Sequence, residues 1–315
     1  SVMKSYTKEQ FVKDVIAGII VAIIALPLSI ALALASGVTP EKGIYTAITA
    51  GFVISFLGGS RVQIAGPTAA FATIVAGIVA KNGMDGLIIA TLLAGVILIL
   101  MGFLRLGNLI KFIPYTITTG FTSGIAVTIF IGQIKDFLGL TIVSEEPLIE
   151  TMDKLKAVFQ FISTTNVQAL LVGVISLLIL ILWQYLPGFC KKIPPSLIAV
   201  LVGSAMVALL KMNVNTIGDL YEISNKLPSI SLPAFSLKTV QNVLPDAFTI
   251  AILAAIESLL SCVVADSMVN SRHRSNMELI AQGAGNITSA LFGGIPATGA
   301  IARTAANVKN GGRTP

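Results

Sequence analysis

Two short stretches decide the fold: GPTAAFATIVAG at residues 66–77 and IPATGAIARTAAN at residues 295–307. Each contains a helix breaker, Gly-Pro in the first and Ile-Pro in the second, and continues with small residues. Neither run can cross a bilayer alone, because a spanning helix needs about 20 mostly apolar residues. We therefore expect two short helices, Thr68–Ala80 and Thr298–Lys309, that begin inside a membrane.

The segments that precede these two stretches are also alike. Residues 14–59 begin with Asp-Val and end with Phe-Leu-Gly-Gly, and residues 246–294 begin with Asp-Ala and end with Leu-Phe-Gly-Gly. The offset between the two copies is 232 residues at the start and 235 at the end. Segments one to three thus correspond to segments eight to ten. Because a shift of seven helices is odd, we expect the second copy to be inserted upside down, as an inverted repeat.

An inverted repeat makes the two short helices approach mid-membrane from opposite sides, with their N-termini facing each other. Helix N-termini carry unpaired N–H groups and partial positive charge, so two of them together favour an anion. The alternative is a pair of kinked helices that pack through small residues, a common interface in membranes. Some residues here are small enough to let an anion approach the backbone, and the two threonines carry hydroxyl groups that can donate hydrogen bonds to it. These residues are Gly66, Thr68, Ala69, Ala70, Thr298, Gly299 and Ala300.

The composition predicts a polytopic membrane protein. Of the 315 residues, 55% are apolar and 11% are charged, whereas soluble domains carry roughly 25% charged residues. The mean hydropathy is +0.89. These values exclude a soluble disulfide scaffold, a disordered tail and a nucleic-acid binder. The formal charge of +6 falls largely in short loops, where membrane topology explains it.

Ten apolar segments are expected, and the loops between them orient the chain. With the N-terminus in the cytoplasm, twelve Lys and Arg residues fall on the inner side and two, Lys42 and Lys81, in short outer loops, as the positive-inside rule requires. Residues 144–156, in a long outer loop, are compatible with an amphipathic helix at the membrane surface, and we expect the long outer loops to form an extracellular cap without a chemical role. The ten segments are Val15–Ala35, Gly43–Leu57, Thr68–Ala80, Leu87–Leu104, Thr116–Ile134, Val167–Leu186, Ser196–Leu210, Asp246–Met268, Met277–Phe292 and Thr298–Lys309.

Glu257 is the acidic residue in the middle of an apolar run, at the depth of the expected helix breaks. A carboxylate at mid-bilayer costs several kcal/mol even on the gentler scales, so its presence indicates a partner or a function. Protonation would remove its repulsion toward an anion and so couple anion entry to proton entry. The alternative is a structural carboxyl that is hydrogen-bonded to Ser258, to Ser261 or to a neighbouring helix.

Arg303 is the basic residue within an expected span, and we favour a structural or electrostatic-field role for it over direct ligation of the anion. An ion pair with Glu257 is an alternative. The sequence lacks the residue groups that an enzyme would need, because it shows no paired carboxylates, no phosphate-binding loop and no His/Cys cluster. We therefore expect no enzyme, no cofactor and no bound structural metal, and transport that is secondary or passive.

Four stretches carry a resemblance to a known family: AGIIVAIIALPLSIALALASGVTPEKGIY (17–45), FLGGSRVQIAGPTAAFATIV (56–75), ESLLSCVVADSM (257–268) and NITSALFGGIPATGAIARTAANVKNGGRTP (286–315). Together they resemble the sulfate permease (SulP) family of anion transporters. The resemblance implies an all-α polytopic fold with a seven-plus-seven inverted repeat, of which this chain holds about the first ten segments. It also implies a cytoplasmic STAS domain and a homodimer.

The family resemblance places the substrate between the two facing short helices and implies a set of site residues. Sodium-coupled bicarbonate members tend to show Asp where Glu257 stands, so we expect proton coupling, with a sodium site at Glu257, Ser261 and Gly299 as the alternative. The implied substrate-binding residues are Leu28, Leu32, Thr68, Ala69, Ala70, Ser258, Thr298, Gly299 and Ala300, and the implied coupling residues are Glu257 and Ser261.

The same resemblance implies that residues 1–315 are a transmembrane transport domain. Core helices are expected at about 14–104 and 246–309, and gate helices at about 112–210. Helices eleven to fourteen and the STAS domain are not part of the sequence, so we expect a fragment of a longer protein.

The sequence thus predicts a secondary anion transporter of the inner (plasma) membrane that takes up sulfate with protons by alternating access. Within transport, the alternatives are a sodium-coupled bicarbonate carrier, an anion exchanger and a dicarboxylate carrier. A channel-like anion-binding module or a nucleobase carrier fits the residues less well. The expected partners are a small anion, a co-transported proton or sodium ion, the lipid bilayer and a second copy of the chain, without nucleic acid.

Overall fold

The computed structural model describes residues 6–108, 115–143, 148, 150–186, 193–221, 227–230 and 232–314. The chain divides into two compact units, residues 1–122 together with 224–315, and residues 123–223. The sequence predicts a core and a gate over similar ranges, and those two roles stay a prediction.

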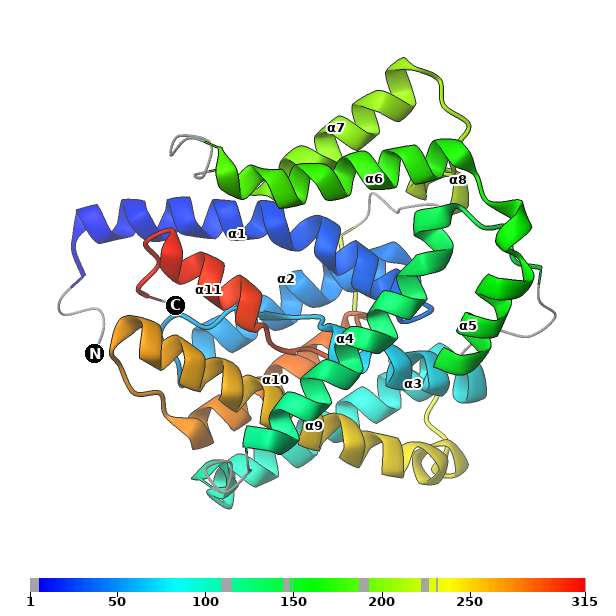
Figure 1. The fold of residues 1–315 in the computed structure, drawn as a ribbon. Coiled ribbons are helices and arrows are strands. Elements are labelled where there is room, and N and C mark those ends of the chain that lie inside the picture. The colour runs from blue at the N-terminus through cyan, green and yellow to red at the C-terminus, as the bar shows by residue number, and fades with distance from the viewer. Residues whose placement is uncertain are drawn as a thin grey trace. The chain divides into compact units, whose positions relative to one another are not determined.

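The first unit contains two sets of helices that lie far apart in the sequence (Figure 1). The early set is α1 (Lys8–Ala35), α2 (Pro40–Leu57) and α3 (Ala72–Phe103). Local signals begin these helices, since the Thr7 hydroxyl accepts the Gln10 N–H and Pro40 occupies the first turn of α2. The late set is α9 (Leu237–Val269), α10 (Ser275–Leu291) and α11 (Ile301–Lys309).

The third and fourth expected segments form one long run with a break. A short 3-10 turn, η2 (Ala69–Phe71), leads into α3, and the helix is interrupted at Gly83, where φ is 66°. A residue with a side chain rarely adopts this left-handed conformation, so glycine sets the place of the break. The two segments predicted from the sequence therefore lie on either side of Gly83.

Two short strands precede η2 and α11, and they correct the expectation of a helix that begins at Thr298. β1 (Ala65–Gly66) pairs antiparallel with β2 (Thr298–Gly299), and the Ala300 N–H donates to the Ile64 carbonyl at 2.8 Å. The backbone at each break is therefore paired with the opposite break and cannot form helical hydrogen bonds. For this reason α11 begins at Ile301, three residues later than expected.

The strand register supports the internal repeat. The order helix, helix, strand, helix occurs twice, and a shift of 233 residues places Ala65 on Thr298 and Gly66 on Gly299. Ala65 pairs with Gly299 and Gly66 pairs with Thr298, so each residue bonds to the equivalent of its own neighbour. Two segments related by a two-fold axis pair in this way. The full count of fourteen helices stays a prediction.

Each repeat also fixes the loop that leads to a strand of the other repeat. Glu278 of α10, only 1% exposed, accepts the backbone N–H groups of Gly59 at 2.9 Å and Ser60 at 3.2 Å. Thr46 of α2 accepts the N–H of Ile295 at 2.7 Å. Because both loops are held by buried hydrogen bonds, the strands that follow them have a defined position.

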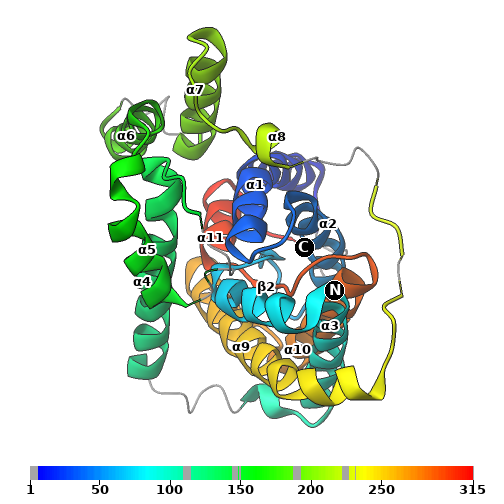
Figure 2. The same cartoon turned by 90° about the vertical axis from the view of Figure 1, so that its right-hand side faces the viewer.

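The helices of the first unit pack closely around the strand pair (Figure 2). Glycines allow the close crossing of α3 and α10, since a Cβ on Gly95 would lie 2.7 Å from the Gly283 carbonyl oxygen and a Cβ on Gly283 would lie 2.5 Å from that of Gly95. Small residues at such crossings are typical of membrane proteins. Large apolar side chains fill the space along α3 and α9, among them Leu87, Ile250 and Leu259.

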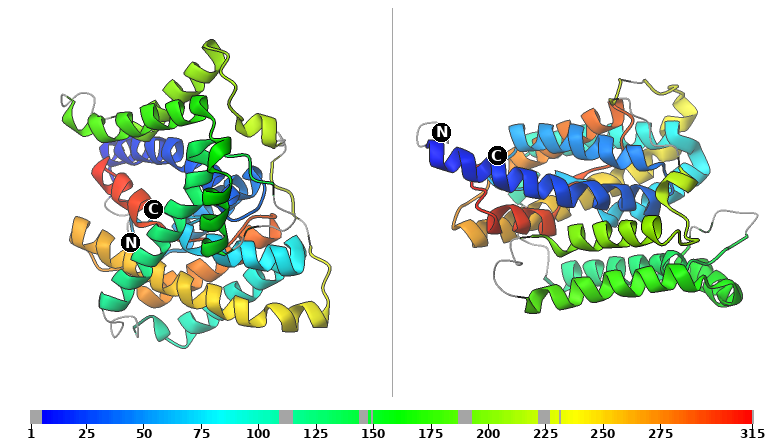
Figure 3. Two further views of the ribbon diagram at one scale, coloured as in Figure 1. Left: turned by 45° about the vertical axis from the view of Figure 1, so that its right-hand side comes forward. Right: turned by 90° about the horizontal axis from the view of Figure 1, so that it is seen from above.

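The two ends of the described chain meet beside α1 (Figure 3). Asp14 accepts the Arg313 N–H at 2.8 Å and the Tyr6 hydroxyl at 2.9 Å. The segment after α11 is therefore held against the first helix.

The second unit is helical as well. It contains most of α4 (Tyr115–Leu138), together with α5 (Thr151–Gln160), η4 (Ile162–Thr164), α6 (Val167–Leu182), η5 (Trp183–Tyr185), α7 (Pro195–Leu209) and α8 (Ile217–Leu220). Helices α6 and α7 pack against each other. The amphipathic helix that the sequence allows at 144–156 is observed only in part: α5 begins at Thr151 and continues to Gln160. Residues 148 and 150 are not helical, and residues 144–147 and 149 lie outside the described part of the chain.

Four helical runs in the described residues are long and apolar enough to cross a membrane. These are Lys8–Ala35, Ala69–Phe103, Val167–Tyr185 and Leu237–Val269, and α7 is a shorter apolar helix. Large apolar side chains such as Phe52 and Phe56 of α2 are more than two-thirds exposed, as a lipid-facing surface requires. The ten-segment count and the orientation of the chain stay predictions.

Candidate functional site

The strand pair brings the two predicted breaks together. Thr68, Ala69 and Ala70 follow β1, whereas Thr298, Gly299 and Ala300 form or follow β2. Figure 2 shows β2 among the helices of the first unit, and α9 packs directly against it. Because the strands are antiparallel, η2 and α11 leave the pair in opposite directions. The structure therefore places the two predicted breaks side by side, and their role in binding an anion near mid-membrane stays a prediction.

Helix α9 touches both breaks within one turn. The Thr68 hydroxyl donates to Oε2 of Glu257 at 3.0 Å, and the Thr298 hydroxyl donates to the Ala254 carbonyl at 3.0 Å. Glu257 is partly buried at this point. The carboxylate thus lies next to the first break, and its hydrogen-bond partner comes from that break.

The two serines of α9 that the sequence predicts for the site have partners other than Glu257. Ser258 donates to the Ala255 carbonyl at 3.3 Å, and the Ser261 hydroxyl lies 3.4 Å from that of Thr304. Thr304 also accepts the Ile64 N–H at 3.0 Å. These contacts connect α9 to α11 and to the chain before β1.

Arg303 is a buried cation with free donors at the same place. It is 2% exposed, and its Nη2 donates to the Pro67 carbonyl. Its Nε and Nη1 atoms have no hydrogen-bond partner among the described residues, and no ion pair with Glu257 is found there. A buried charge without a counterion is energetically unfavourable. The uncompensated charge of this guanidinium produces a positive potential beside the strand pair.

Two residues that the sequence did not single out also belong here. Gln63 is 5% exposed, and its Oε1 accepts a hydrogen bond from the Cys262 thiol. Its Nε2 has no partner among the described residues. The sequence offers little signal for either residue beyond the position of Gln63 three residues before the Gly-Pro break. The other cysteine, Cys190, lies outside the described residues.

The remaining site predictions lie on α1. Leu32 is buried, whereas Leu28 is 39% exposed. Their contact with a substrate stays a prediction. Among the described residues, no three His, Cys, Asp or Glu side chains are grouped so that they could hold a metal ion.

The turn between α9 and α10 contains a separate polar cluster. Nδ1 of His273 lies 2.7 Å from Oδ2 of Asp266, and Nε2 lies 3.0 Å from the Ser275 hydroxyl. Asp266 also accepts the His273 backbone N–H at 2.9 Å. These bonds close the turn after Asn270, the left-handed residue that ends α9, and so have a structural role.

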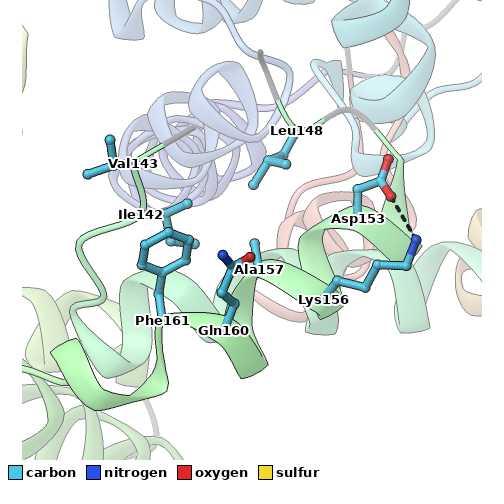
Figure 4. A pocket seen from close by; sticks show the side chains of 8 residues that line it. All are labelled: Ile142, Val143, Leu148, Asp153, Lys156, Ala157, Gln160 and Phe161. Carbon is cyan, nitrogen blue, oxygen red and sulfur yellow. Dashed lines mark hydrogen bonds and ion pairs between the residues drawn. The ribbon is translucent and has the colours of Figure 1, made fainter. Parts of the chain in front are cut away.

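A pocket of about 250 Å³ lies beside α5 in the second unit (Figure 4). Ile142, Leu148 and Phe161 are apolar groups in its wall, and Lys156 forms a surface ion pair with Asp153 at 3.4 Å. Pairs of this kind contribute little to stability or specificity. None of the predicted site residues lines this pocket.

The sequence of this chain matches a known protein family. A family model described as the sulfate permease family matches residues 11–315. The chain belongs to the sulfate permease family. The expected family membership is therefore confirmed, and the family is one of transporters and not of enzymes.

Relatives within the sulfate permease family differ in what their names say they carry. The chain is 45% identical to the "Putative sulfate transporter YvdB" of Bacillus subtilis, an alignment that covers 99% of this chain and 58% of that protein. It is 34% identical to the "Bicarbonate transporter BicA" of Picosynechococcus sp., covering 96% and 54%. The chain thus spans little more than half the length of these relatives.

A solved structure confirms the predicted fold class. The transmembrane domain of a cyanobacterium bicarbonate transporter, BicA, superposes with a TM-score of 0.85 at 31% identity, over 98% of this chain and 79% of that one. This sulfate permease family member is therefore an all-α membrane protein with the transporter fold of its relatives.

Proposed function

We propose that this chain is the transport domain of a secondary anion transporter that takes up sulfate together with protons. One observation carries the proposal: the paired strands bring two helix breaks, the free donors of Arg303 and the carboxylate of Glu257 to a single place. Donors and positive charge attract an anion. A carboxylate that can bind a proton beside them makes binding depend on protonation.

The coupling we propose depends on the charge of Glu257. When its carboxylate is ionised, it repels an incoming anion and accepts the hydrogen bond of Thr68. When Oε2 or Oε1 carries a proton, this repulsion is removed and the anion can occupy the donors of the strand pair. Movement of the core against the gate would then carry proton and anion across the membrane together.

The substrate and the coupling ion have a specific alternative. Two relatives are named bicarbonate transporters, at 34% identity each, so a sodium-coupled bicarbonate carrier is the second candidate. In that case Glu257, Ser261 and Gly299 would supply oxygens to a sodium ion. An anion exchanger or a dicarboxylate carrier would use the same site without this ion.

We further propose that the protein lies in the plasma membrane with its N-terminus in the cytoplasm and acts as a homodimer. The first unit would serve as the core and the second as the gate. The family resemblance and the distribution of Lys and Arg support these assignments.

An uptake experiment tests the proposed function. The full-length protein that contains this transport domain is purified and reconstituted in liposomes, and uptake of labelled sulfate, bicarbonate and fumarate is measured at two external pH values, with and without sodium. We expect sulfate uptake that rises when the outside is more acidic and that does not need sodium. Sodium-dependent bicarbonate uptake would establish the alternative, and absence of uptake of all three anions would contradict both.

A further inference from the structure

We propose that Gln63 donates a hydrogen bond to the transported anion and that Cys262 orients its side-chain amide for this purpose. The inference rests on the proposed function and adds a specificity residue to the same site.

The backbone fixes Gln63 at the edge of the strand pair. Its neighbour Ile64 donates its N–H to the Thr304 hydroxyl at 3.0 Å and accepts the Ala300 N–H at 2.8 Å. Both bonds connect the chain before β1 to the start of α11. The position of Gln63 therefore follows from the pairing of the two breaks.

The side chain of Gln63 reaches the other break. A Cβ added to Gly299 would collide with Nε2 of Gln63 and would lie 3.2 Å from Cα of Ser258. The amide nitrogen therefore lies over Gly299, next to α9. Gly299 and Ser258 are both residues that the sequence predicts to contact the substrate.

The amide nitrogen at this position has no acceptor within the ranges that the structure describes. Gln63 is 5% exposed, and Nε2 has no hydrogen-bond partner among the described residues. Buried donors in native proteins are nearly always paired. An anion that enters the strand pair would bring the acceptor atoms that this donor lacks.

Cys262 determines which end of the amide faces Gly299. Its thiol, fully buried on α9, donates to Oε1 of Gln63, and a glutamine amide carries its acceptor and its donors on opposite sides. With Oε1 engaged by the thiol, the NH₂ group is turned toward the strand pair. This orientation suits an anion, whereas a cation would require the opposite one.

The same arrangement occurs on the other strand. A Cβ on Gly66 would collide with Nη1 of Arg303, which is also buried and has no hydrogen-bond partner in the described part of the chain. Gly66 and Gly299 are equivalent in the repeat, and each is approached by a free N–H donor from the opposite repeat. Gln63 is thus the neutral counterpart of Arg303.

The test measures sulfate binding to the purified protein by calorimetry, with bicarbonate as a second probe. A hydrogen bond to a charged group is worth about tenfold or more in affinity. For the anion that the unmodified protein binds, Gln63→Leu should therefore weaken the affinity by about that factor. Gln63→Glu replaces the donor by a carboxylate and should abolish binding at neutral pH. Gln160→Leu, the same change on α5, should leave the affinity unchanged.

Two variants of Cys262 test its positioning role independently of Gln63. Cys262→Ser keeps a donor toward Oε1 and should retain the affinity, whereas Cys262→Ala removes the donor and should weaken binding several-fold. This pair decides the question even if the Gln63 variants do not fold. Unchanged affinity in Gln63→Leu, or equal affinity in the two Cys262 variants, overturns the inference but leaves the proposed function standing. If the unmodified protein binds neither anion, the proposed function fails first.

Discussion

Glu257 is connected to the first break by one hydrogen bond, from the Thr68 hydroxyl at 3.0 Å. Glu257→Gln keeps the size of the side chain and imitates its protonated form. The anion should still bind, because the repulsive charge is absent, and exchange of one anion for another should continue. Accumulation driven by a pH gradient should disappear, since no proton can be carried at this position.

The two activities of Glu257→Gln are measured in liposomes, as counterflow of labelled sulfate and as net uptake under an imposed pH gradient. Asp153→Asn, a carboxyl-to-amide change on α5, is the matched control and should preserve both. If the Glu257→Gln protein still accumulates sulfate like the unmodified protein, the carboxyl is structural and coupling occurs elsewhere.

The substitution Gly66→Ala tests whether sulfate binding depends on the position of the Arg303 guanidinium. A Cβ at this residue would meet Nη1 of the guanidinium, and crowding of this kind costs about 1–3 kcal/mol. Gly66→Ala should therefore displace the guanidinium and weaken sulfate binding by about tenfold. Gly77→Ala, where a Cβ would have open space, should bind like the unmodified protein. Equal affinities of both variants would show that Arg303 does not act on the anion.

The sequence drew attention to part of the candidate site, because some of its residues have a local signal. Thr68, Thr298 and Glu257 stand out because a breaker or an apolar run surrounds each of them. Gln63, Cys262 and Thr304 do not stand out, since each acquires its role from a partner far away in the chain, as in the bond between Cys262 and Gln63. A hydrophobicity pattern contains no information about such pairs.

At the scale of elements, the sequence located the helices well and their ends less well. Apolar length predicts a helix, so α2, α6 and α10 lie close to their expected positions, whereas α1 and α9 begin earlier than expected, at Lys8 and Leu237. The strand pair could not be foreseen, because β1 and β2 are only two residues long and each is stabilised by the other. The start of α11 moved to Ile301 for this reason.

The crossing of α3 and α10 gives a prediction at the same scale. A Cβ on Gly283 would lie 2.5 Å from the Gly95 carbonyl oxygen and 2.6 Å from Cγ1 of Ile99. Gly283→Ala should thus separate the helices and lower the stability by about 1–3 kcal/mol. Thermal unfolding in detergent would show this as a lower Tm.

Gly18→Ala in α1 is the control for this crossing. Its Cβ would meet nothing within 4 Å, and alanine favours a helix by about 1 kcal/mol relative to glycine. The Tm of this variant should stay the same or rise. A Gly283→Ala protein as stable as Gly18→Ala would mean that the two helices do not depend on their glycine contact.

At the scale of the whole molecule, the internal repeat is the feature that makes the sequence informative. Composition gave the membrane class, and the offset of the two copies predicted which segments correspond to one another. The register of the strands and the reciprocal bonds of Thr46 and Glu278 follow from three-dimensional contacts, so they became visible only in the structure. The two copies thereby bring their two breaks together at one place, where we propose that the anion binds.

The most direct test locates the anion itself. Selenate has the shape and charge of sulfate, and its selenium atom scatters X-rays anomalously, so an anomalous difference map of crystals grown with selenate shows where the anion binds. We predict a selenium peak beside the paired strands, with its oxygens about 3 Å from the free donors of Arg303 and Gln63. A map with no peak at the strand pair, or with its strongest peak elsewhere in the first unit, would contradict the account.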